Sequence, residues 1–194
     1  MEQSAQAPLT STNNEAALIL RARANEARAW QTLVETHQQP VFRLALLITG
    51  DPDDAADVAQ DAFLRAYRKL ARFDPSRAFG PWILAITSRL ASNRRRSAGR
   101  YLHLLTRWHL EAAHKPPGRG GAPSELWRAL QRLKAMARQV VYLRYFLGLS
   151  EAETALVLGI PGGTVKSRTA RALRKLGDII ETHYPELKPG QDDG

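Results

Sequence analysis

Apolar residues recur at helical spacing along nearly the whole chain, and no segment keeps the strict alternation of a half-buried strand. The pattern therefore predicts an all-α fold. Residues 1–13 are polar and carry no such pattern. The expected helices cover about 15–24, 26–37, 40–49, 52–70, 81–97, 124–148, 151–159 and 164–182, and the pattern also allows a short helix within 101–113.

The helix after Asp51 has the clearest start. Asp51 suits the N-cap, Pro52 suits the first helical position, and Asp53 and Asp54 favour the positive end of the helix dipole. Its apolar residues follow a 3.6-residue period and are expected to face the core. They are Ala55, Val58, Ala59, Ala62, Phe63, Ala66, Tyr67 and Leu70.

Proline and glycine divide the chain into two parts. The stretch from Lys115 to Pro123 contains three prolines and three glycines, so it predicts a flexible linker rather than a regular element. We expect two small helical domains joined by this linker. The predicted bounds are a disordered N-terminus at 1–14, a first domain at 15–97, the linker at 98–123, a second domain at 124–183 and a disordered tail at 184–194.

The second domain carries a helix-turn-helix pattern. Ser150 and Glu153 form a capping box, Gly159 can supply a left-handed turn, and Ile160 and Val165 can fill the angle between the two helices. The second helix exposes Lys166, Ser167, Ala170 and Arg171 near its N-terminus, where such proteins read base edges. An ordinary helical hairpin with a basic outer face is the alternative.

Composition narrows the possible functions. The chain has 194 residues, 44% of them hydrophobic, and no cysteine, which excludes disulfides, thiolate metal sites and thiol catalysis. The N-terminus lacks the features of a signal peptide, and no apolar run reaches the length of a membrane span. We therefore expect a soluble, cytoplasmic protein without a membrane span.

The net charge of +9 is unevenly distributed. Residues 41–62 hold one arginine and five aspartates, whereas residues 63–100 hold ten basic residues and one aspartate. Residues 163–177 hold five basic residues and no acid. Surfaces normally mix their charges, so these blocks favour two anion-binding surfaces and a separate acidic one over long helices with charged outer faces.

The acidic block places an exposed leucine among carboxylates. Asp57, Gln60, Asp61 and Leu64 share one helix face, which suits protein docking better than DNA binding. A helix-dipole role would explain Asp53 and Asp54 but not Asp61, which lies too far along the helix.

The basic block combines phosphate-binding side chains with aromatics in and beside the loop 74–79, as single-stranded nucleic acid requires. Phe79 and Trp82 could instead belong to the core, and for Trp82 we favour the core.

Two stretches resemble bacterial extracytoplasmic-function sigma factors. Residues 53–96, with Asp-Asp-Ala-Ala-Asp-Val-Ala-Gln-Asp-Ala-Phe-Leu-Arg-Ala-Tyr, Phe-Asp-Pro-Ser-Arg and Pro-Trp-Ile-Leu, look like the family's second domain. Residues 140–176, with Leu-Gly-Ile-Pro-Gly-Gly-Thr-Val-Lys-Ser-Arg, look like its fourth domain. The resemblance implies a two-domain polymerase subunit without a cofactor or metal.

The resemblance also implies roles for individual residues. Core RNA polymerase would contact Asp57, Gln60, Asp61 and Leu64. The minus-ten promoter element would be opened and held by Ser76, Arg77, Phe79, Arg89, Asn93, Arg95 and Arg96. The minus-thirty-five element would contact Thr164, Lys166, Ser167, Arg168, Ala170 and Arg171. An anti-sigma factor is a further partner that the resemblance suggests.

The sequence supports two other functions less well. A self-sufficient dimeric helix-turn-helix repressor or activator would bind DNA, but it leaves the acidic face and the basic aromatic loop unexplained. An enzyme is disfavoured because the sequence lacks a Walker-type loop, a nucleophile elbow and paired metal ligands. His103, His109 and His114 fall on different faces of a helix, so they do not form a ligand set.

Overall fold

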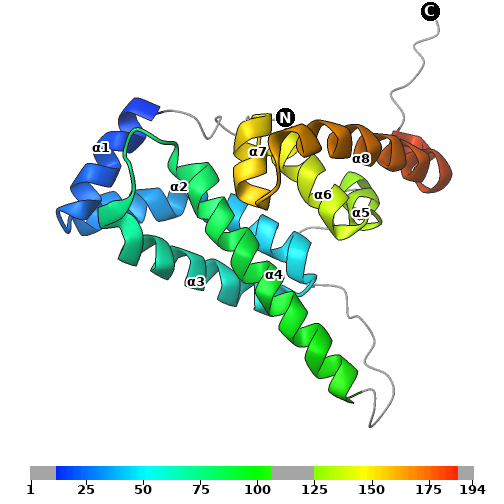
Figure 1. Cartoon of the computed structure of the whole chain (residues 1–194), viewed down its shortest axis with the longest axis horizontal. Coiled ribbons are helices and arrows are strands. Elements are labelled where there is room, and N and C mark those ends of the chain that lie inside the picture. The colour runs from blue at the N-terminus through cyan, green and yellow to red at the C-terminus, as the bar shows by residue number, and fades with distance from the viewer. Residues whose placement is uncertain (1–11, 106–124, 188–194) are drawn as a thin grey trace, which may run out of the picture.

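The computed structural model describes residues 12–105 and 125–187; side chains are described within 14–96 and 125–187. The first group of helices (Figure 1) comprises α1 (Thr12–Arg23), α2 (Ala27–Thr49), α3 (Pro52–Lys69), the 3₁₀ turn η1 (Leu70–Arg72) and α4 (Phe79–Leu105). The second comprises α5 (Glu125–Gln131), α6 (Ala135–Val141), the π-helical turn η2 (Tyr142–Phe146), α7 (Glu151–Leu158), α8 (Gly162–His183) and η3 (Pro185–Leu187). The described residues contain no strand, in agreement with the all-α expectation.

Helices α2, α3 and α4 pack against one another, and α1 packs on α2. The long α2 buries residues such as Leu33, Leu44 and Leu47 along one side. It continues through Pro40, where the sequence predicted a break. Proline removes one helical hydrogen bond and crowds the preceding turn. Leu33 and His37 before Pro40 and Val41 and Leu44 after it are buried, and this packing offsets the cost, so the helix remains continuous.

Local capping chemistry is confirmed at both predicted helix starts. The Asp51 carboxylate accepts from the backbone N–H of Asp54 at 2.8 Å. In α7 the Ser150 hydroxyl accepts from the Glu153 N–H, while the Glu153 carboxylate accepts from the Ser150 N–H. Gly159 then ends α7 with φ +64°, a left-handed conformation that favours glycine. These contacts fix the turn between α7 and α8.

Other predicted boundaries were wrong. The single helix expected over 124–148 is divided at 132–134 and ends in the π-helical turn. Helix α4 runs through Leu105, so 98–105 are helical rather than linker, and 185–187 form η3 within the predicted tail. Helix α1 begins at Thr12, so 12–14 are helical rather than disordered. The expectations for 1–11, 106–124 and 188–194 lie outside the described residues.

The two groups of helices also touch each other. Helix α4 contacts α7, and α2 contacts α6 (Figure 1). Buried residues from both groups, such as Ile48 and Val157, belong to one apolar cluster. Residues 88–96 of α4 therefore face the helix-turn-helix instead of lying apart from it.

Candidate protein and nucleic-acid interfaces

The outer face of α3 presents three of the residues predicted to dock a protein. Gln60, Asp61 and Leu64 are exposed, and the Leu64 side chain retains 47% of its accessible area. An exposed leucine beside a carboxylate on a rigid helix can contribute an apolar anchor and a charge to a partner. The exposure of these three residues agrees with the prediction.

Asp57, the fourth predicted docking residue, is already engaged within the chain. Nη2 of Arg94 in α4 lies 3.0 Å from Oδ2 of Asp57, and Nε of Arg94 donates to Oδ1 of Asp54 at 2.8 Å. The hydrogen bond that Arg94 donates to Asp54 and the negative charge of Asp54 raise the pKa of the Arg94 guanidinium, and Asp57 adds to this effect. Asp57 thus joins α3 to α4 as well as facing solvent.

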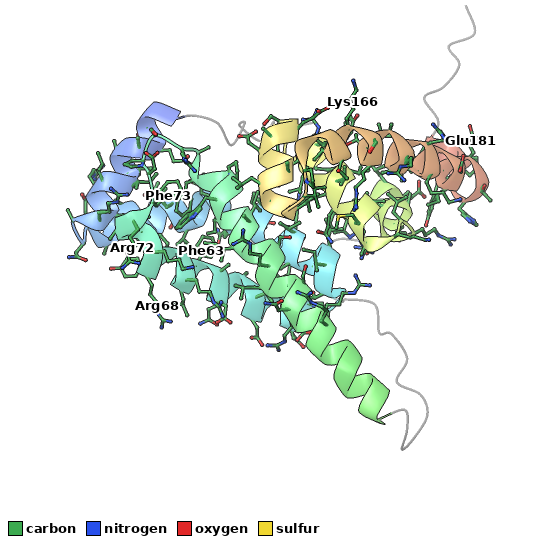
Figure 2. The ribbon with its side chains drawn as sticks, viewed as in Figure 1. Phe63, Arg68, Arg72, Phe73, Lys166 and Glu181 are labelled. Carbon is green, nitrogen blue, oxygen red and sulfur yellow. The ribbon has the colours of Figure 1, made fainter. Side chains whose placement is uncertain are left out.

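Two apolar hollows flank this α3 face. One, of about 290 Å³, is lined by residues that include Trp30, Phe63, Leu64 and Tyr67. The other, of about 410 Å³, lies between α2 and α3 and includes Phe42 and Gln60. We call Gln60, Asp61 and Leu64, together with these two hollows, the α3 ridge. Figure 2 shows Phe63 within the first helical group and Arg68 projecting outward from α3.

Tyr67 was predicted to face the core but is exposed at the rim of the first hollow. Its ring lies 5.0 Å from that of Trp30, centroid to centroid. Sequence reasoning missed both residues as parts of the ridge. Leu64 and Tyr67 are three residues apart on one helix, and this spacing could have indicated that Tyr67 lies beside Leu64 on the ridge.

The loop between η1 and α4 is a tight polar turn. Oδ1 of Asp74 accepts from the Ser76 hydroxyl at 2.7 Å and from the Ser76 backbone N–H at 3.0 Å. These hydrogen bonds, and more weakly the nearby Arg77 charge, lower the pKa of Asp74. Ser76 and Arg77 are exposed at the tip, where the sequence analysis expected DNA contacts.

Phe79 corrects the expectation of an exposed stacking ring. Its side chain is completely buried. The ring lies 5.9 Å from Phe73, 5.4 Å from Trp82 and 5.2 Å from His37, centroid to centroid. A ring enclosed in this way cannot stack on a base, so Phe79 anchors the loop instead. Trp82 is partly buried and packs against the core, as favoured above.

The predicted minus-ten face of α4 lines a groove between the two helical groups. The groove has a volume of about 750 Å³ and is lined on the α4 side by Ser88, Arg89, Ser92, Asn93, Arg95 and Arg96. Residues of α6 and α7, including Gln139 and Val157, form the opposite side.

None of the described residues that line the groove is acidic, so its polar side chains suit phosphate groups. Burial lowers the pKa of Arg138 in α6, and the charge of Arg95 lowers it further. Arg89, Arg95 and Arg96 supply the charges that line the groove, so it presents a cationic surface.

Helix α8 presents the predicted recognition surface. Lys166, Ser167, Ala170 and Arg171 are all exposed, whereas Val165 is fully buried at the angle with α7. Thr164 and Arg168 lie beside them, half-buried. Nε of Arg171 donates to the Ser167 carbonyl at 3.2 Å. Figure 2 shows Lys166 pointing away from the rest of the molecule.

Within the described residues, no cluster of histidine, aspartate and glutamate side chains could hold a metal ion. In the same part of the chain, no helix combines the length and the apolar character that crossing a membrane requires. The three histidines discussed above fall outside the described side chains.

Both helical groups match known families. The model of sigma-70 region 2 matches residues 33–101, and that of sigma-70 region 4 matches residues 124–176. The first match covers all of α3 and most of α2 and α4. The second covers α5 to α7 and α8 as far as Leu176.

Relatives match across most of the chain. The ECF RNA polymerase sigma factor BldN of Streptomyces coelicolor is 32% identical over 170 residues, which cover 84% of this chain and 64% of BldN. The chain thus spans just under two thirds of that relative. The ECF RNA polymerase sigma factor SigL of Mycobacterium tuberculosis is also 32% identical over 170 residues, covering 82% of this chain and 93% of SigL.

Two solved structures share the fold. CnrH in complex with the cytosolic domain of CnrY is 26% identical, with a TM-score of 0.64 and coverage of 87% of this chain and 98% of CnrH. The sigma factor RpoE of Bartonella quintana, in complex with the anti-sigma factor NepR, is 22% identical, with a TM-score of 0.68. That match covers 81% of this chain and 99% of RpoE, and it supports the fold alone.

Proposed function

The chain belongs to the extracytoplasmic-function RNA polymerase sigma factors, and on this basis we propose that it binds core RNA polymerase and directs promoter recognition. The observation that carries the proposal is the presence of an exposed docking ridge, a polar loop beside a cationic helix, and a basic recognition helix in one chain. A sigma factor needs all three, because it must hold the polymerase while contacting duplex and melted DNA.

We propose that the α3 ridge docks on core polymerase. Leu64 and the hollow beside it offer apolar area at the centre, and Asp61 offers a charge at the edge. Interfaces commonly combine a desolvated apolar anchor with a polar rim. Basic side chains on the polymerase would complement Asp61, while Asp57 stays bound to Arg94.

We propose that the loop 74–79 and the outer face of α4 hold the melted minus-ten element. Ser76 and Arg77 at the loop tip could contact bases and phosphates, and Arg89, Asn93, Arg95 and Arg96 would follow the strand. Because α6 and α7 line the same groove, DNA binding there requires these helices to move away from α4. Binding to polymerase would supply the energy for that movement.

We propose that α8 reads the minus-thirty-five element in the major groove. Lys166 and Arg171 carry the donors that guanine accepts, and Ser167 can serve several bases. Arg168 and Thr164 lie at the side of the helix, where phosphate contacts would fix its orientation.

The family relationship also supports an anti-sigma partner competing for these surfaces. A cytoplasmic location and the absence of any catalytic chemistry of its own belong to the same proposal.

Transcription with purified components tests the proposal. The chain is added to core polymerase from the source organism, with fragmented genomic DNA as template, and the 5′ ends of the transcripts are mapped. We expect new start sites that share upstream elements and depend on the chain. No specific start on any template would overturn the proposal. Tight duplex binding by a dimer of the chain alone would instead favour the repressor or activator function.

A further inference from the structure

Helix α1 is bonded to the backbone at both ends of the loop proposed to read DNA. On one side, Nε of Arg23 donates to the carbonyl of Leu70 at 2.8 Å. On the other, Oε2 of Glu15 accepts from the backbone N–H of Phe79 at 2.9 Å. Arg23 and Glu15 belong to the same helix, so the distance between the two loop ends is set by a rigid element.

The Glu15 carboxylate is held firmly in place. Its other oxygen, Oε1, lies 2.9 Å from Nε2 of His37 in α2. The His37 side chain is 1% exposed and that of Glu15 is 12% exposed. Low exposure keeps water from competing for these hydrogen bonds and makes each one more costly to lose. Glu15 thus ties α1, α2 and the start of α4 together at one buried point.

The loop itself has few other supports. Among the described residues, the hydrogen bonds of its tip run between Asp74 and Ser76 and between Asp74 and Arg77, all within the loop. Phe73 and Phe79 anchor its two ends in the aromatic cluster. The position of Ser76 and Arg77 therefore depends on where the ends are held, and α1 supplies a polar contact to each end.

Helix α1 precedes the residues that the sigma-70 region 2 family model matches. Its link to the loop comes from the three-dimensional contacts, because Glu15 and Phe79 are 64 residues apart in sequence. The helix would otherwise be regarded as an accessory element packed on α2.

We propose that Glu15 and Arg23 are positioning residues, and that α1 acts as a brace that sets the geometry of the loop for capture of the melted promoter strand. This inference rests on the proposed function. Neither residue needs to touch DNA. Glu15 acts through the Phe79 backbone, and Arg23 acts through the Leu70 carbonyl.

Four variants of the full chain test the brace. Glu15→Ala removes both Glu15 hydrogen bonds, whereas Glu15→Gln keeps an oxygen for the Phe79 N–H and an amide for His37. Arg23→Ala removes the contact at the other loop end and provides a second route if Glu15→Ala does not fold. Glu26→Ala is the control, since it deletes an exposed carboxylate that binds Arg21 near the end of α1.

The first measurement is hydrogen exchange of the free chain, which needs neither DNA nor polymerase. We expect exchange at the backbone amides of 73–79 to rise by about tenfold or more in Glu15→Ala, in line with the loss of a hydrogen bond to a charged group. Arg23→Ala should raise exchange at the same residues. Glu15→Gln and Glu26→Ala should remain close to the unsubstituted chain, as should α8 in every variant.

The second measurement is the affinity of holoenzyme for a short single-stranded oligonucleotide that carries the minus-ten element of a promoter mapped in the transcription experiment. We expect Glu15→Ala to weaken it about tenfold, comparable to losing one base contact, with polymerase affinity unchanged and with rescue by Glu15→Gln.

Unchanged loop exchange in both alanine variants would overturn the brace, as would faster exchange with unchanged oligonucleotide affinity. If the unsubstituted holoenzyme fails to start transcription, the proposed function fails, and hydrogen exchange alone then decides whether α1 holds the loop.

Discussion

Nη2 of Arg94 in α4 lies 3.0 Å from Oδ2 of Asp57 in α3, so a carboxylate on the proposed polymerase-binding face is already paired within the chain. Asp57 remains 61% exposed, but its charge is partly balanced by this guanidinium. Asp61, one turn further along α3, has no ion pair among the described residues. The two aspartates therefore differ in the charge that they can offer a partner.

This difference predicts unequal effects on polymerase binding. Asp61→Ala should weaken the affinity of the chain for core polymerase by about tenfold, and Leu64→Ala by at least as much, within the range of interface anchor residues. Asp57→Ala should weaken it less, because the partner loses a charge that Arg94 already balances. Fluorescence anisotropy with labelled chain would measure all three affinities.

The thermal unfolding midpoint provides the control for these variants. Exposed ion pairs contribute little to stability, so Asp57→Ala should shift the midpoint only slightly. Asp61→Ala should leave it unchanged. A larger loss of binding in Asp57→Ala than in Asp61→Ala would contradict the proposed order.

Arg171 is predicted to contribute to promoter recognition without contributing to polymerase binding. Arg171→Ala should lower the affinity for duplex carrying the minus-thirty-five element by about 10- to 100-fold, as expected for one base-contacting arginine. Lys175→Ala is the matched control, since Lys175 is exposed further along α8 and pairs with Asp178. Gel-shift titrations with holoenzyme would compare them. Equal losses in the two variants would indicate general charge attraction in place of base reading.

The polar turn in the proposed minus-ten loop lowers the pKa of Asp74, and substitutions in the turn should change that pKa measurably. The Ser76 hydroxyl is the main cause of the lowered pKa of Asp74. Ser76→Ala should therefore raise that pKa toward the ordinary aspartate value of about 3.9. Arg77→Ala should raise it less, because the Arg77 charge contributes more weakly. Carboxyl-carbon NMR titration would distinguish the two.

The direction of the shift also fixes the pH range in which the turn is stabilised. A carboxyl whose pKa is lowered by folding contributes its full stabilisation above its unfolded pKa, and loses it as the pH falls through the lower folded value. The loop turn should thus be unaffected near neutral pH and weaken only in acid. A loss of Asp74–Ser76 bonding between pH 6 and pH 8 would contradict this.

The sequence predicted features that depend on neighbouring residues. The caps at Asp51 and Ser150 and the left-handed turn at Gly159 are local chemistry, so their positions were right. The exposed face of α8 followed from them, because the turn fixes the helical register. Short sequence strings around these turns also suggested the family, which the match to the sigma-70 region 4 model confirmed.

Features set by distant packing were not predictable. Phe79 was expected to be exposed because it ends a polar loop, but four aromatic residues from three segments enclose it. Tyr67 has the correct helical phase for burial, yet no helix in the described part of the chain covers it. The bonds of Glu15 and Arg94 to residues 64 and 37 positions away leave no local pattern. The contact of α4 with α7 likewise has no signal in the sequence.

Tyr142 supplies a final prediction that tests the packing of the second helical group. Its side chain is almost fully buried, and Oη has no hydrogen-bond partner among the described residues. Burial also raises the pKa of this hydroxyl. Since an unpaired buried hydroxyl costs free energy, Tyr142→Phe should increase the free energy of unfolding by about 1 kcal/mol.

The matched control is Tyr145→Phe, because Tyr145 lies in the same π-helical turn but is exposed. Water already satisfies its hydroxyl, so that variant should change stability by less than about 0.5 kcal/mol. Urea unfolding followed by circular dichroism would compare both variants with the unsubstituted chain. If Tyr142→Phe were destabilising instead, its hydroxyl must have a partner in solution, and the packing around η2 would differ from the arrangement described above.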